Sequence, residues 1–141
     1  MKKSRILIID GQGGGIGRLL TENIKSGFPE ALVTAVGTNV LATQAMMRAG
    51  ADAAATGENA VIVACKKADI IVGPIGIVIA DSLLGEITPA MAVAVGQSPA
   101  LRILLPLNQC DNQVVGVENT GTSYLVKKCM ELIRGCLDKA E

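Results

Sequence analysis

Short aliphatic runs alternate along the chain with stretches in which apolar residues recur every three or four positions. The aliphatic runs predict six strands, at Arg5–Ile9, Ala31–Val36, Ala53–Thr56, Asp69–Val72, Arg102–Leu105 and Val114–Val117. Helices are expected between them, the first with Ile16, Leu19, Leu20 and Ile24 on its buried side, the others at Val40–Ala49, Ala60–Cys65, Ile77–Leu84, Ala90–Val95 and Thr122–Leu137. Strands that alternate with helices indicate an α/β fold with a mostly parallel sheet covered on both faces.

Several residues predict where the helices begin and end. Thr38 or Asn39 can cap the second helix, and Thr88-Pro89 reads as an N-cap followed by the first helical residue. The run Ala60–Cys65 suits either a buried strand or a short helix. We favour the helix because a parallel sheet needs a crossover there and Thr56 can cap it. Gly85 is expected to stop the helix before it.

The turn after the first strand holds five glycines in seven positions, from Gly11 to Gly17, directly before a helical pattern. A helix N-terminus with free N–H groups favours an anion, and glycine lets the backbone approach it closely. On a parallel sheet this is a Rossmann-like, doubly wound arrangement, in which ligands bind beyond the carboxyl ends of the strands. The spacing of Gly11, Gly15 and Gly17 resembles the TGxxxGIG cofactor loop of short-chain dehydrogenases, which implies NAD or NADP.

Three features depart from that pattern. The second strand ends in the neutral Gly37-Thr38-Asn39, where an acid usually binds the ribose hydroxyl. The fourth strand ends in Gly73-Pro74-Ile75-Gly76 rather than Asn-Ala-Gly. Asp10 replaces the threonine of the loop, and three roles are open to it: capping the N–H groups of the loop, holding a metal ion, or repelling the ligand.

Four residues are candidates for acid–base chemistry, each with a structural alternative. Tyr124 and Lys128 have the YxxxK spacing of short-chain dehydrogenases, but they fall on the last helix and suit a solvated face equally well. Glu58 is either a base or a partner of a helix dipole. Asp81 is either on the wet side of a helix or a buried, paired acid. Glu86 is expected to pair with N–H groups at the helix start near Pro89.

The composition excludes several classes of function. Thirteen basic residues balance thirteen acidic ones and only Phe28 and Tyr124 are aromatic, which argues against nucleic-acid binding. The chain has no histidine, the commonest general base and metal ligand, and no metal site is predicted. Four cysteines without a CxxC motif fit reduced thiols in the cytoplasm. The apolar runs are too short to span a membrane.

Nearly the whole chain resembles a short bacterial family of unknown function that opens with the same Ile-Asp-Gly-Gln-Gly-Gly-Gly-Ile-Gly. Further shared blocks are Gly37-Thr38-Asn39, Gly57-Glu58-Asn59, Gly73–Gly76, Gly85–Pro89 and Leu105–Asn108. The resemblance runs from Arg5 to Leu137 and implies a Rossmann-like fold in a bacterial cytosolic protein. It implies no activity.

Most of these blocks fall just past the carboxyl ends of predicted strands, which predicts one ligand-binding edge. The predicted cofactor-binding residues are Asp10, Gly11, Gln12, Gly13, Gly14, Gly15, Ile16, Gly17, Thr38, Asn39, Glu58, Asn59, Gly73, Pro74, Ile75, Gly76 and Asn108.

These observations predict a single domain over residues 1–141 that binds a nucleotide, with no reaction assigned. The alternative is a non-enzymatic sensor or assembly subunit that binds a nucleotide or small anion. A metal-assisted phosphoryl-transfer site at Asp10 and Glu58 ranks last, because the chain lacks the Gly-Lys-Ser/Thr of a P-loop. The apolar composition favours a homo-oligomer. Gly14→Val is expected to impair binding more than folding.

Overall fold

One parallel sheet forms the centre of the molecule. The computed structural model describes residues 2–107, 111–118 and 121–140. Five strands lie in the order β3-β2-β1-β4-β5, and every neighbouring pair is parallel. The strands are β1 (Arg5–Asp10), β2 (Leu32–Gly37), β3 (Ala53–Thr56), β4 (Ile70–Pro74) and β5 (Leu101–Leu105). The chain reverses its direction of travel across the sheet between β3 and β4, so β1 lies in the middle, as in doubly wound folds.

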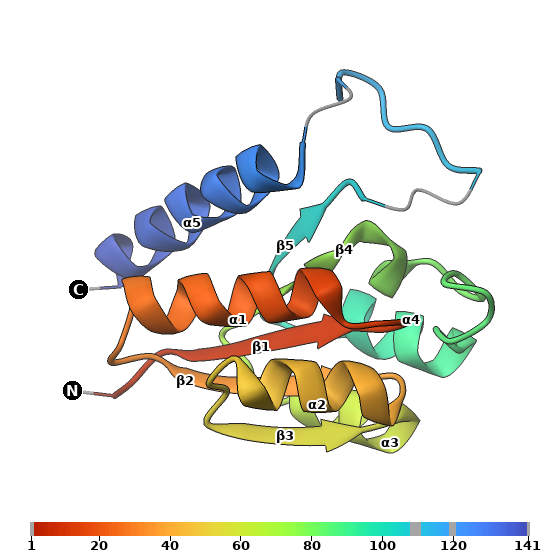
Figure 1. The fold of residues 1–141 in the computed structure, drawn as a ribbon, viewed down its shortest axis with the longest axis horizontal. Coiled ribbons are helices and arrows are strands. Elements are labelled where there is room, and N and C mark those ends of the chain that lie inside the picture. The colour runs from red at the N-terminus through yellow and green to blue at the C-terminus, as the bar shows by residue number, and fades with distance from the viewer. Residues whose placement is uncertain (1, 108–110, 119–120, 141) are drawn as a thin grey trace.

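Helices cover both faces of this sheet (Figure 1). One face carries α1 (Gly15–Gly27), α2 (Val40–Arg48) and α5 (Thr122–Lys139), and the other carries α3 (Glu58–Cys65) and α4 (Pro89–Gln97). Successive side chains of a strand point to opposite faces, so Ile6 and Ile8 of β1 enter the first core while Leu7 and Ile9 enter the second. The predicted α/β fold is therefore confirmed.

The sixth predicted strand, Val114–Val117, is absent: these residues form turns and irregular backbone. Val115 is fully exposed and Val117 is 41% exposed. The run is apolar, but it lacks both a buried face and a paired neighbour, which are the features that stabilise a strand. The described residues form a sheet of five strands instead of about six.

The predicted helix at Ile77–Leu84 is also wrong. A single 3₁₀ turn, η1 (Ile75–Val78), follows β4, and the backbone then winds through tight turns. We call residues 79–88 the strap. Positive φ angles recur within it, at Asp81, Leu83, Leu84 and Gly85. Leu83 and Ile87 are buried although they lie in turns. A hydrophobic pattern alone does not distinguish such buried turn residues from the buried face of a helix.

The remaining helix starts follow the expected chemistry with one exception. Asn39 caps α2 by accepting a hydrogen bond from the Ala42 amide, and Thr88 caps α4 by accepting one from the Met91 amide. Thr56 caps nothing, because α3 begins directly after Gly57 and has no side-chain cap. Among the described residues, no helix combines the length and apolar character needed to cross a bilayer.

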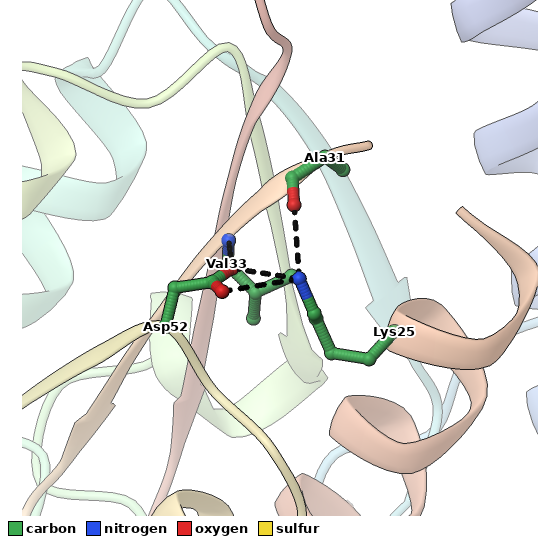
Figure 2. Close-up of polar contacts among 4 residues, drawn as sticks. All are labelled: Lys25, Ala31, Val33 and Asp52. Carbon is green, nitrogen blue, oxygen red and sulfur yellow. Dashed lines mark hydrogen bonds and ion pairs between the residues drawn. The ribbon is translucent and has the colours of Figure 1, made fainter. Parts of the chain in front are cut away.

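An ion pair between Lys25 and Asp52 lies at the end of the sheet away from the glycine loop (Figure 2). Lys25, near the end of α1, donates to both carboxylate oxygens of Asp52 at 3.1 and 2.9 Å and to the Ala31 carbonyl at 3.2 Å. Asp52 also accepts the Val33 amide at 2.8 Å. This cluster ties α1, β2 and the residue before β3 together at the end of the sheet away from the glycine loop.

Candidate functional site

The carboxylate of Asp10 accepts hydrogen bonds from both ends of the glycine loop. It is the last residue of β1 and only 5% of its surface is exposed. One carboxylate oxygen accepts the Gly11 amide at 2.8 Å, and the other accepts the Gly17 amide in the first turn of α1 at 2.7 Å. Of the three roles open to this residue, capping the amides of the loop is therefore the one that the geometry supports.

Burial makes Asp10 an unusual acid. Removal from water raises its pKa from 3.8 to about 6, although the amides of Gly17 and Gly11 lower it. The nearby negative charge of Glu86 raises it further. A buried carboxylate loses its hydration, and the hydrogen bonds from the two backbone amides offset only part of that loss. The acid at the base of the loop therefore has a pKa of about 6, well above the 3.8 of an ordinary aspartate.

The glycines of the loop divide into two groups. At Gly14, which has a φ of +73°, an added Cβ would lie 2.7 Å from the Ala42 Cα, and at Gly17 it would lie 2.7 Å from the Met46 sulfur. At Gly13 and Gly15 an added Cβ would meet no atom within 4 Å. A side chain would therefore collide with packed atoms at Gly14 and Gly17, whereas Gly13 and Gly15 face open space. The expectation that Gly14→Val acts mainly on binding is therefore wrong.

Three backbone N–H groups of the loop have no acceptor among the residues that the structure describes. They belong to Gly13, Gly15 and Ile16, at the start of the 13-residue helix α1. The neighbouring amides are occupied: Gly14 donates to the Gly11 carbonyl, and Gly17 donates to Asp10. The first turn of α1 thus offers a compact group of donors at the positive end of the helix dipole.

Glu86 of the strap reaches the same edge of the sheet. Its Oε1 accepts the Gln12 amide at 2.9 Å, the Thr38 hydroxyl at 2.6 Å and the Asn39 side-chain amide at 2.7 Å. Asn39 also donates to the Gln12 carbonyl at 2.9 Å. The strap is thereby fastened to both the glycine loop and the end of β2.

Sequence reasoning missed this role, because Glu86 was expected to pair at the start of α4. Thr88 already caps that helix, which leaves the Glu86 carboxylate for the glycine loop. The available signal was the block Gly85–Pro89, which contains Glu86 and belongs to the family resemblance. Partial burial raises the pKa of Glu86, but the bonds from Thr38, Gln12 and Asn39 outweigh it and hold the pKa below its usual value. Glu86 is thus a carboxylate at neutral pH.

The other predicted binding residues are distributed differently. Glu58 lies at the exposed start of α3 and accepts the Thr88 hydroxyl at 2.6 Å, while Asn59 is exposed. Gly73 and Pro74 are buried at the end of β4, where a Cβ on Gly73 would lie 2.5 Å from the Ile9 carbonyl oxygen. Gly73 therefore permits close packing of β4 on β1. Asn108 lies outside the described residues.

The four candidates for acid–base chemistry do not converge. Asp81 is exposed, and Tyr124 and Lys128 lie on the solvent side of α5. The Lys128 ammonium lies 5.5 Å from the centre of the Tyr124 ring and pairs with Glu131 at 3.2 Å. Glu58 and Asp10 belong to separate sets of hydrogen bonds. Within the described ranges, no three histidine, cysteine or acidic side chains gather as a metal site would require.

Comparison with known proteins assigns the chain to a family. A family model described as "Domain of unknown function (DUF3842)" matches residues 5–138, and the chain belongs to this family. No curated protein matches. A solved structure, described as a dodecameric FMN-dependent Ubix-like decarboxylase from Escherichia coli O157:H7, is 16% identical with a TM-score of 0.47. The match covers 93% of this chain and 74% of the other.

The expectation of NAD or NADP is corrected. The similar solved structure is described as FMN-dependent, which does not point to a nicotinamide dinucleotide. The chain itself gives a physical reason: Thr38 and Asn39, the groups expected to bind a ribose of the dinucleotide, both donate to Glu86 instead.

Proposed function

We propose that this protein binds a phosphomonoester of nucleotide size at the glycine loop. The observation that carries the proposal is the set of three unoccupied amides, at Gly13, Gly15 and Ile16, beside glycines whose Cβ positions face open space. Backbone N–H groups at a helix start bind phosphate because they combine hydrogen-bond donors with the positive end of the helix dipole.

Asp10 and Glu86 limit how such a ligand binds. Asp10 occupies the Gly17 amide from beneath, and Glu86 occupies the Gln12 amide from the side. The free donors are enough for one phosphate group, and the amides that a second group would use are already taken by the two carboxylates. This arrangement of donors supports a monophosphate as the ligand.

Glu86 also has a free acceptor. All three of its hydrogen bonds go to Oε1, and no described residue donates to Oε2. A carboxylate oxygen held in place by its partner oxygen is a good acceptor for a hydroxyl group. The proposed ligand therefore carries hydroxyl groups close to its phosphate, as the ribose of AMP and the ribityl chain of FMN do.

Calorimetric titration with AMP, FMN, ribose 5-phosphate and inorganic phosphate tests this proposal. Gly15→Ala is the informative variant, because its methyl group would enter the proposed phosphate site without contacting the protein. We expect it to weaken binding at least about tenfold, or about 1.4 kcal/mol. Gly135→Ala on α5, whose methyl group also meets open space, is the matched control and should bind normally.

The titrations also distinguish the possible ligands. Binding of ribose 5-phosphate alone would place recognition in the phosphate and its hydroxyl chain, whereas tighter binding of AMP or FMN would add recognition of a ring. Absence of binding by all four compounds would refute the proposal, as would equal affinity in Gly15→Ala and the wild type.

A further inference from the structure

Helices α3 and α4 present an apolar surface to solvent. They lie together on the face of the sheet opposite α1, α2 and α5 (Figure 1). Val63 of α3 is 42% exposed and Val93 of α4 is 52% exposed. Glu58 is the one charged residue within α3, and α4 has none. We call this surface, made by Ile62, Val63, Ala90, Val93, Ala94 and Gln97, the α3–α4 face.

Two apolar hollows flank α3. One of about 290 Å³ lies between α3 and the strands and includes Val63, Ala60, Val36 and Ala55 in its wall. The other, of about 360 Å³, lies between α3 and α4 and is lined by Ile62, Ala94 and Val93 among others. Alanine side chains contribute to both walls, and α3 forms a ridge between the two grooves. Such a surface can interdigitate with a copy of itself.

The charges at the two ends of α3 identify the partner. Glu58 opens the helix, and Lys66 and Lys67 follow its last residue. Neither lysine forms an ion pair with any described residue. Helix α3 has eight residues and is about 12 Å long. A two-fold axis across its middle would place it antiparallel to α3 of the other copy. Glu58 of each copy would then meet the lysines of the other, and the helix dipoles would be opposed favourably.

A second exposed apolar surface lacks this complementarity. On α2, Val40, Leu41 and Met47 are 59%, 70% and 50% exposed. The one charged residue of that helix is Arg48, so a symmetric contact there would bring no acid of α2 to face it. Exposure alone would favour α2 as the surface that contacts a second copy, but charge complementarity favours α3.

We infer that the α3–α4 face is the contact surface of a homodimer, in which α3 packs antiparallel against α3 of a second copy. The inference is independent of the ligand at the glycine loop, which lies at the carboxyl edge of the sheet. It gives a location to the homo-oligomer that the apolar composition predicts.

The mass of the full-length protein in solution tests this inference. Sedimentation equilibrium should give twice the 14.5 kDa chain mass for the wild type and the monomer mass for Val63→Glu and Val93→Glu. Both side chains are exposed in the single chain, so circular dichroism should show intact folding of each variant. Leu41→Glu on α2 is the matched control, and its mass should equal that of the wild type.

Charge reversal tests the orientation. Replacing Lys66 and Lys67 by glutamate should weaken association about tenfold through repulsion from Glu58 of the other copy, and adding Glu58→Lys should restore it. A monomeric wild type would overturn the inference, and so would dissociation by Leu41→Glu with no effect of Val63→Glu. Failure of the Glu58→Lys rescue would overturn the antiparallel arrangement.

Discussion

The Thr38 hydroxyl lies 2.6 Å from Oε1 of Glu86, although 48 positions separate the two residues in the chain. Rossmann-like folds usually place an acid at the end of the second strand, and here that strand ends in neutral residues. The strap supplies a carboxylate to the same place from a distant part of the chain. The site is therefore assembled from three segments: the glycine loop, the end of β2 and the strap.

Removing the Glu86 carboxylate should loosen this assembly. Glu86→Ala takes away the acceptor of three donors, at Gln12, Thr38 and Asn39. Because water reaches these partly exposed groups, we expect the free energy of unfolding to fall by about 1–2 kcal/mol. Glu86→Gln keeps one acceptor oxygen and should lose less. Urea denaturation measures both, and equal losses in the two variants would contradict the role assigned to these hydrogen bonds.

Gly14→Ala should destabilise the fold. Its methyl group would lie 2.7 Å from the Ala42 Cα, and the residue has a φ of +73°, where an L side chain is strained. Overpacking against backbone and left-handed strain together predict a loss of about 2–4 kcal/mol in thermal or urea unfolding. Gly15→Ala, one residue further along, meets no atom and should unfold like the wild type. Similar unfolding of the two variants would contradict this division of the loop.

Asp10 should make stability depend on pH between about 4 and 6. Its folded pKa, near 6, exceeds the unfolded value of 3.8, so the folded protein retains a proton that the unfolded chain has lost. The stabilisation by this proton is complete below pH 4 and is lost as the pH rises through 6, amounting to at most about 3 kcal/mol. Asp10→Asn removes the titration.

The difference in unfolding free energy between the wild type and Asp10→Asn isolates this effect from the other acids. We expect Asp10→Asn to be more stable relative to the wild type at pH 7 than at pH 4. Urea denaturation at a series of pH values measures the difference, and a constant difference would show that Asp10 titrates as an ordinary aspartate.

The Lys25–Asp52 contact should have the opposite dependence on pH. The Val33 amide, followed by Lys25, holds the pKa of Asp52 below 3.8 despite partial burial. Asp52→Asn should therefore cost about 1 kcal/mol at neutral pH, and this cost should disappear as the pH falls through the folded pKa, below 3.8. Glu22→Gln, which breaks the exposed Arg18–Glu22 pair, is the control and should cost less than about 0.5 kcal/mol. An equal cost in the two variants would contradict the importance of the Val33 hydrogen bond.

The fold was largely predictable because its elements are locally consistent. Aliphatic runs mark all five strands, and Asn39 and Thr88 cap helices where their residue types predict. The strap was not predictable by the same means. Its apolar residues are buried from successive tight turns, and Leu83 and Leu84 adopt φ angles that their side chains disfavour. The Ser82 hydroxyl donates to the Gly76 carbonyl within the same segment, a contact that no hydrophobic pattern encodes.

The candidate site was predictable only in part for a related reason. The glycine loop and Asp10 are adjacent in sequence, so strand, turn and helix patterns indicate their shared edge. Glu86 reaches that edge through the path of the strap, and no periodicity encodes the path. The tightly packed glycines could not be separated from the open ones either. Gly14 and Gly15 are neighbours in sequence, but only the first contacts α2.

The long separation between Gln12 and Glu86, 74 positions, also has a consequence for synthesis of the chain. On the ribosome the glycine loop emerges early, together with β1 and the start of α1. The Gln12 amide gains its acceptor only once Glu86 has been synthesised, after the whole of β4. A nascent chain that ends before the strap therefore has the glycine loop without the Glu86 carboxylate that accepts the Gln12 amide. The edge of the sheet that carries the glycine loop is therefore complete only after four of the five described strands have been synthesised.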